Sequence, residues 1–101
     1  MARVSKQFLE AYKPLSTKEL KDPVIFVVDM IEGFVHEGAL HDEEINAATV
    51  HIEALIRDAE QRVIFIADSH PPKTREFNSY PSHCVIGTKE SEVIQELQPY
   101  V

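Results

Sequence analysis

Residues 24–29 read VIFVVD and residues 63–68 read VIFIAD, two short apolar runs that each end in an aspartate. A run of five apolar residues, rich in β-branched and aromatic side chains, is typical of a strand covered on both faces, as in parallel sheets. We therefore expect strands at 24–28 and 63–67. Strand, helix and strand in this order predict a right-handed βαβ unit and an α/β fold with a parallel sheet.

The segment between the two strands, residues 41–62, has the periodicity of an amphipathic helix. Apolar residues recur at spacings of three and four, and most charged residues lie off that stripe. Asp42 is a suitable amino-terminal cap, because its carboxylate can accept hydrogen bonds from the first free N–H groups of the helix. The predicted stripe consists of Ile45, Ala48, Ile52, Leu55, Ile56 and Ala59.

The remaining segments have weaker patterns. Residues 5–12 suit a short helix that ends before Pro14. Residues 88–97 have a short helical pattern, and a third strand could begin at residues 99–101. Two strands with the composition of interior strands make a poor sheet by themselves, so the fold looks incomplete.

Composition excludes several classes of protein. A chain of 101 residues suits one core, so we divide it into an N-terminal helical or irregular segment, 1–22, and the amino-terminal part of one α/β domain, 23–101. The formal net charge of −7 argues against a nucleic-acid partner. No apolar run approaches the roughly 20 residues that cross a bilayer, so we expect no membrane partner. Cys84 is the only cysteine, and the amino terminus lacks a signal-peptide core, which favours the cytoplasm.

Two aspartates mark the expected ligand-binding edge of the sheet. In open α/β sheets, ligands bind beyond the carboxyl ends of the strands, where Asp29 and Asp68 are expected. A carboxylate that directly follows a buried strand is costly to desolvate unless something pairs with it. Each aspartate could also merely cap the following turn, because aspartate is common there.

Asp68, His70 and His83 form a candidate metal site. Side chains alternate along a strand, so Asp68 and His70 would point the same way, and a loop could bring His83 back to them. Two imidazoles with one carboxylate are a common zinc ligand set, which iron or manganese also tolerates. The alternative is an ordinary surface contact between Asp68 and His70. We expect His36, His41 and His51 to be solvated.

Three stretches resemble the nicotinamidase branch of the isochorismatase-like cysteine hydrolases. They are VIFVVDMIEGF (24–34), FIADSHPP (65–72) and EFNSYPSHCVIGTKESEVIQEL (76–97), and they occur in the order of the family. The stretch from Tyr80 to Thr88 is the most specific, because it joins a metal-ligand histidine to a Gly-Thr turn. It favours nicotinamidases over isochorismatase proper, which does not depend on these metal ligands.

The resemblance implies a three-layer α/β sandwich with a parallel sheet, of which this chain is the amino-terminal half. It implies that Asp29 is the catalytic acid–base residue and that a divalent ion, Zn²⁺ before Fe²⁺ or Mn²⁺, is held by Asp68, His70 and His83. Phe34 and Tyr80 match substrate-binding positions, although relatives usually have a larger aromatic in place of Tyr80. The implied reaction is deamidation of nicotinamide or a similar small amide through a cysteine thioester.

The family's lysine and nucleophilic cysteine have no counterpart in the matching stretches. Cys84 belongs to the metal-loop motif, and Lys89 lies too early, so we expect neither to fill these roles and Lys89 to be solvated. We therefore expect the 101-residue chain to be inactive alone. Its partner would be a missing carboxy-terminal half or a second copy. The alternatives are a non-catalytic metal-binding or interaction protein on the same half-fold, and an α/β fragment without a ligand.

Overall fold

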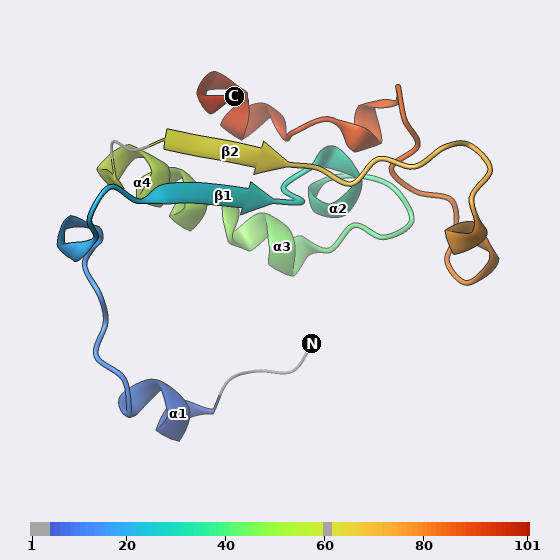
Figure 1. Cartoon of the computed structure of the whole chain (residues 1–101). Helices are drawn as coiled ribbons and strands as arrows, with labels where there is room; N and C mark the ends of the chain where they lie inside the picture. The colour runs from blue at the N-terminus through green and yellow to red at the C-terminus, as the bar shows by residue number, and fades with distance from the viewer. Residues whose placement is uncertain (1–4, 60–61) are drawn as a thin grey trace.

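The computed structural model describes residues 5–59 and 62–101 and contains the expected pair of parallel strands. Strand β1 spans Val24–Val28 and β2 spans Arg62–Ile66, with Val24 opposite Arg62 and Val28 opposite Ile66. The second strand thus begins and ends one residue earlier than expected. Figure 1 shows the two strands side by side with the intervening helices next to them. The predicted α/β class with a parallel sheet is confirmed, and the sheet is incomplete.

The connection between the strands contains three helices, α2 (Glu32–Val35), α3 (Glu43–Ala47) and α4 (Thr49–Ala59). The prediction of one continuous helix over 41–62 was wrong at Ala48 and at Arg62, which belongs to β2, and its residues 60 and 61 lie outside the described residues. At Ala48 the backbone N–H donates to the Ile45 carbonyl, three residues back, which tightens the turn before α4 continues. Asp42 caps α3 as expected, because its side chain accepts a hydrogen bond from the Glu44 N–H.

The hydrophobic core lies on one face of the sheet. Ile25 and Val27 on β1 and Val63 and Phe65 on β2 point to that face, and Val27 is buried. The apolar stripe of α4 packs there through Ile52 and Ile56, whereas Leu55 is exposed despite its place in the predicted stripe. The buried centre of the core consists of Val27, Met30, Val35, Ile56, Ile94 and Leu97.

The opposite face of the sheet is open. Phe26 and Val28 on β1 and Ile64 and Ile66 on β2 alternate with the core residues, and Phe26 is 58% exposed. The expectation that both faces would be covered was therefore wrong for the described residues. The reason is that the described helices and turns pack on the side of Ile25 and Val27, so two of the three expected layers are present in this part of the chain.

The carboxy-terminal segment is less regular than the sequence suggested. It contains the 3-10 helices η3 (Lys89–Ser91) and η4 (Gln95–Tyr100), so a single helix at 88–97 and a strand at 99–101 were both wrong. Between them, Val93 forms an antiparallel bridge with Ile31, and the Ile94 N–H donates to the Met30 carbonyl. These bonds hold the segment extended beside the end of β1 and interrupt the helix.

At the amino terminus, α1 (Lys6–Glu10) is the short helix predicted over 5–12. Ser5 caps it, and it ends before Pro14. The 3-10 helix η1 (Thr17–Glu19) leads to β1, while α1 lies apart from the strands (Figure 1). Within residues 5–59 and 62–101, no helix combines the length and the apolar character needed to cross a membrane.

Candidate metal centre

The two aspartates at the strand ends contact each other. Asp29 follows β1 with a φ of 60°, and its N–H donates to the Ile66 carbonyl at 2.8 Å. Its carboxylate accepts a hydrogen bond from the Asp68 N–H at 3.0 Å. Because this contact joins the ends of two neighbouring strands, Asp29 does more than cap its own turn. The parallel pairing of β1 and β2 places both carboxylates at one edge of the sheet.

Backbone pairing beyond β2 brings the two histidines together. The His70 N–H donates to the Cys84 carbonyl at 2.9 Å, and the Ile86 N–H donates to the His70 carbonyl at 2.7 Å. These bonds form a parallel bridge between His70 and Val85. The loop of residues 71–82 therefore returns the chain beside His70, and the rings of His70 and His83 lie 4.8 Å apart between centroids.

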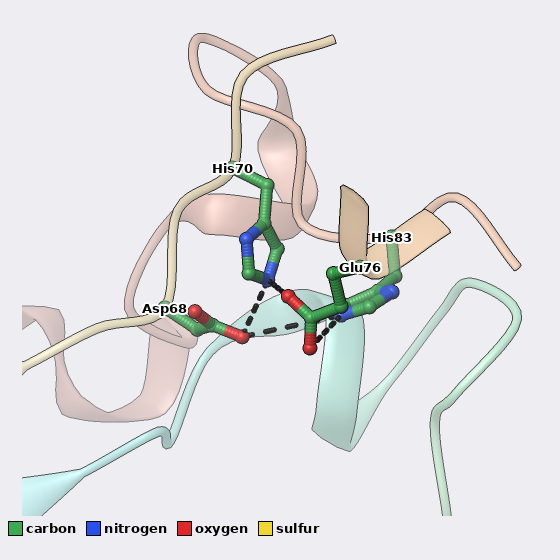
Figure 2. A group of neighbouring side chains, drawn as sticks. All are labelled: Asp68, His70, Glu76 and His83. Carbon is green, nitrogen blue, oxygen red and sulfur yellow. Dashed lines mark hydrogen bonds and ion pairs between the residues drawn. The ribbon is translucent and has the colours of Figure 1, made fainter. Parts of the chain in front are cut away.

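Four side chains converge at this point (Figure 2). Each can supply one ligand atom, and all four atoms lie within 4.8 Å of one another. His70 Nε2 lies 2.9 Å from Asp68 Oδ2 and 2.8 Å from Glu76 Oε2. His83 Nε2 lies 4.0 Å from Asp68 Oδ2 and 3.9 Å from Glu76 Oε1. The members of this cluster are Asp68, His70, Glu76 and His83.

Glu76 was not identified from the sequence. It lies on the 3-10 helix η2 (Arg75–Asn78), where the Thr74 hydroxyl accepts a hydrogen bond from the Glu76 N–H, and that turn directs the carboxylate at the histidines. A signal was present, because Glu76 is the only acidic residue between His70 and His83. The sequence did not show whether the loop would fold inward at that position.

The donor types and the closeness of the four ligand atoms suit a divalent cation. Ligand atoms at about 2.0–2.2 Å from a tetrahedral zinc lie about 3.3–3.6 Å from one another; the two His70 distances above are shorter than that range and the two His83 distances are longer. His70 Nε2 faces two carboxylates, although it carries either one hydrogen or one lone pair. A cation at the centre would satisfy both carboxylates at once.

The protonation of His83 supports the same fit. Its Nδ1 lies 2.8 Å from the Pro81 carbonyl, which can only accept a hydrogen bond, so Nδ1 carries the proton. In the neutral ring, Nε2 then presents its lone pair to the cluster. The His83 ring is 2% exposed, which keeps water from competing for that lone pair. Two neutral imidazoles and two carboxylates also balance the charge of a divalent ion.

Aromatic rings surround the buried histidine. The Phe34 ring on α2 lies 6.0 Å from the His83 ring, and the Phe77 ring on η2 lies 5.3 Å from it. Tyr80 lies 6.4 Å from His83 and is 54% exposed, so it stands at the rim. Phe34 and Tyr80 were expected beside the substrate, whereas Phe77 was not singled out. All three rings therefore border the His83 imidazole.

Cys84 lies next to His83 but lacks the properties of a nucleophile. Its side chain is 0% exposed. Burial raises the pKa of the Cys84 thiol to about 11, and neighbouring carboxylates act in the same direction. A reactive cysteine requires the opposite shift, because the thiolate is the attacking species. In order of effect, the carboxylates are those of Asp68, Glu90, Asp29 and Glu76.

The other histidines lie outside the cluster and are exposed, as expected. His36 Nε2 pairs with Glu96 at 2.7 Å, and His41 Nδ1 contacts the Gly38 carbonyl at 2.6 Å. His51 lies exposed on α4. Lys89 is exposed as well, and its ammonium lies 3.9 Å from Glu37.

The sequence and the fold match known proteins. The sequence model of the isochorismatase domain matches residues 23–101. The chain belongs to the isochorismatase family. It is 34% identical over 83 residues to Nicotinamidase 1 of Arabidopsis thaliana, an alignment that covers 73% of this chain and 34% of that protein. The crystal structure of N-carbamoylsarcosine amidase from Thermoplasma acidophilum matches with a TM-score of 0.60 and 34% identity, over 78% of this chain and 47% of that one.

The matches cover only part of each of the two similar proteins. The chain spans between a third and a half of the length of these two proteins. The matched part contains both strands, the acidic strand ends and the whole ligand cluster. The site at the edge of the sheet therefore lies within the stretch that the isochorismatase-domain model matches.

Proposed function

We propose that the protein is a metal-assisted amidohydrolase of the isochorismatase family that acts on nicotinamide or a similar small amide. The observation that supports this proposal is the convergence of Asp68, His70, Glu76 and His83 on one point beside Asp29. In the proposed site these four residues hold a divalent ion, Zn²⁺ before Fe²⁺ or Mn²⁺. If it keeps an open coordination position besides these four ligands, the bound ion would supply a Lewis acid that orients a ring nitrogen of the substrate and ordered water.

The other residues of the site have distinct roles in this proposal. Phe34 and Phe77 pack against the flat ring of the substrate, and Tyr80 contacts it at the exposed edge of the site. Asp29 accepts the proton of the attacking thiol. The thiolate then adds to the amide carbonyl, ammonia leaves with that proton, and water hydrolyses the resulting thioester to acid and free thiol. Cys84 does not supply this thiol, because it is buried and protonated at neutral pH.

The nucleophile and its lysine come, in this proposal, from the part of the family fold that the match does not span. The same part would cover Phe26 and Ile64 on the open face of the sheet. It could be further polypeptide or a second copy of this chain, and intact mass together with light scattering separates the two. A non-catalytic metal-binding protein is the second candidate, favoured by the fact that the four ligands lie together without a usable thiol beside them.

Metal binding by the purified protein tests the first part of the proposal. We expect the protein to retain about one equivalent of zinc, iron or manganese after dialysis. His83→Ala should lose the metal, whereas the matched control His51→Ala, on the exposed side of α4, should keep it. A protein that binds no metal would contradict the proposed site.

For catalysis, we expect ammonia release from nicotinamide only when the rest of the hydrolase fold is present, and loss of that activity in Asp29→Asn. We expect the 101-residue chain alone to release none. Ammonia release by the chain alone that disappears in Cys84→Ser would show that Cys84 is the nucleophile after all. Metal binding without any amide hydrolysis in the complete protein would favour the second candidate.

A further inference from the structure

The backbone next to His83 is held in an unfavourable conformation from two sides. Cys84 has a φ of 46°, in the left-handed region that non-glycine residues rarely adopt. Its carbonyl accepts a hydrogen bond from the His70 N–H at 2.9 Å. Its own N–H donates to Glu90 Oε1 at 3.2 Å. The conformation that directs the His83 ring thus depends on His70, which is itself in the cluster, and on one side chain outside it.

The chain makes room for Glu90 at two glycines. A Cβ atom built on Gly33 would lie 2.9 Å from the Glu90 Cβ and 3.0 Å from its carbonyl oxygen. A Cβ atom on Gly38 would lie 2.5 Å from Glu90 Oε1. Gly87, the third glycine of the chain, has no atom within 4 Å of such a Cβ. Glu90 thus lies close against two of the three glycines, and Gly33 also faces the Cys84 Sγ, which would lie 2.7 Å from its Cβ.

The Glu90 side chain lies between α2 and the turn at Cys84, two segments that border the site. Gly33 lies on α2, the helix that also carries Phe34, whose ring lies 6.0 Å from the His83 ring. Glu90 packs against α2 with its stem and holds the Cys84 N–H with its carboxylate. Glu90 therefore bridges α2 and the turn that follows His83.

We propose that Glu90 is a positioning residue of the metal centre, whose carboxylate fixes the turn at Cys84 and thereby aims His83 at the point that His70 faces. The inference rests on the proposed metal-binding function, and it adds a residue that contacts no ligand atom of the cluster. Its contribution comes from the acceptor oxygen and not from packing alone. Residues that orient metal ligands typically affect metal affinity about 10- to 100-fold.

A series of variants separates the acceptor from the packing. Glu90→Gln keeps an oxygen that can accept the Cys84 N–H, whereas Glu90→Met fills a similar space without an acceptor. Glu92→Met is the matched control, because Glu92 is exposed on the same segment. The measurements are zinc affinity by competition with a chelator and the visible spectrum of the Co²⁺-loaded protein, which reports the coordination geometry of the ion.

We expect Glu90→Gln and Glu92→Met to keep the wild-type spectrum and nearly the wild-type affinity. Glu90→Met should bind zinc about 10- to 100-fold more weakly and shift the Co²⁺ spectrum toward that of His83→Ala. Wild-type affinity and spectrum in Glu90→Met would overturn the inference, as would equal losses in the Met and Gln variants. Absence of metal binding in the wild type would instead remove the metal centre, and this role with it.

Discussion

The thiol of Cys84 should be nearly inert in the folded protein, and its reactivity tests whether it can act as a nucleophile. A thiol with its ordinary pKa of 9.0 is about one-tenth thiolate at pH 8, and one with a pKa of about 11 is about one-thousandth thiolate. The difference in thiolate fraction alone therefore predicts that Cys84 is alkylated about 100-fold more slowly in the native protein than in the unfolded chain. Because the side chain is 0% exposed, the measured ratio should be larger still.

Iodoacetamide labelling followed by intact mass measures this ratio directly, because Cys84 is the only cysteine and one adduct reports one site. The same reaction in concentrated urea gives the unfolded rate, and Cys84→Ser, which should gain no mass, is the control. Labelling of the native protein at pH 8 within about tenfold of the unfolded rate would refute the reasoning, since it would require an accessible and ionised thiol.

The same pKa shift has a consequence for stability. A group whose pKa is raised on folding stabilises the native state below its unfolded pKa, and that contribution is lost as the pH rises through the folded pKa. For Cys84 the window lies between pH 9.0 and about 11. At pH 10.5 the free energy of unfolding should have fallen by about 2 kcal/mol more than in Cys84→Ser. Urea titrations of both proteins at pH 8 and pH 10.5 measure the difference, and parallel losses in the two would contradict it.

Two substitutions test the packing that supports the site. Gly33→Ala would place a methyl group 2.7 Å from the Cys84 Sγ, so we expect a loss of about 1–3 kcal/mol in the free energy of unfolding; an unchanged urea midpoint would show that the contact can relax. Leu97→Ala removes a fully buried side chain from the core and should cost about 2–5 kcal/mol. The exposed control Val50→Ala should change the free energy of unfolding by less than about 0.5 kcal/mol. Similar losses in Leu97→Ala and Val50→Ala would contradict the assignment of Leu97 to the core.

The strands were predictable because their signal is local. Five apolar residues followed by an aspartate occur twice, and each run became a strand within one residue of its expected bounds. The same pattern could not show which faces of the sheet would be covered. Val27 and Phe26 are equally apolar neighbours, yet the first is buried and the second is exposed. Coverage depends on which helices pack on which side, and that information is not contained in the strand itself.

The helix at 88–97 and the strand at 99–101 were wrongly predicted because tertiary contacts decide the structure there as well. Residues 88–97 have a helical spacing of apolar side chains, but Val93 and Ile94 bond to the backbone of Met30 and Ile31 instead of continuing a helix. Tertiary hydrogen bonds outweighed a weak local propensity there. Pro99 has no N–H to donate to a sheet, which also disfavours the third strand that was expected to begin at this point.

The candidate metal centre was easier to predict from the sequence than the rest of the proposed active site, because its residues lie close together in the sequence. Its four ligands lie within residues 68–83, and the bridge between His70 and Val85 closes the loop that contains Glu76. The entropic cost of closing so short a loop is small and rises only slowly with length. The cluster can thus form from β2 and the loop alone, whereas in the proposed function the nucleophile facing Asp29 would come from another part of the fold. Metal binding and amide hydrolysis should accordingly be separable, with the first retained by this chain when the second is absent.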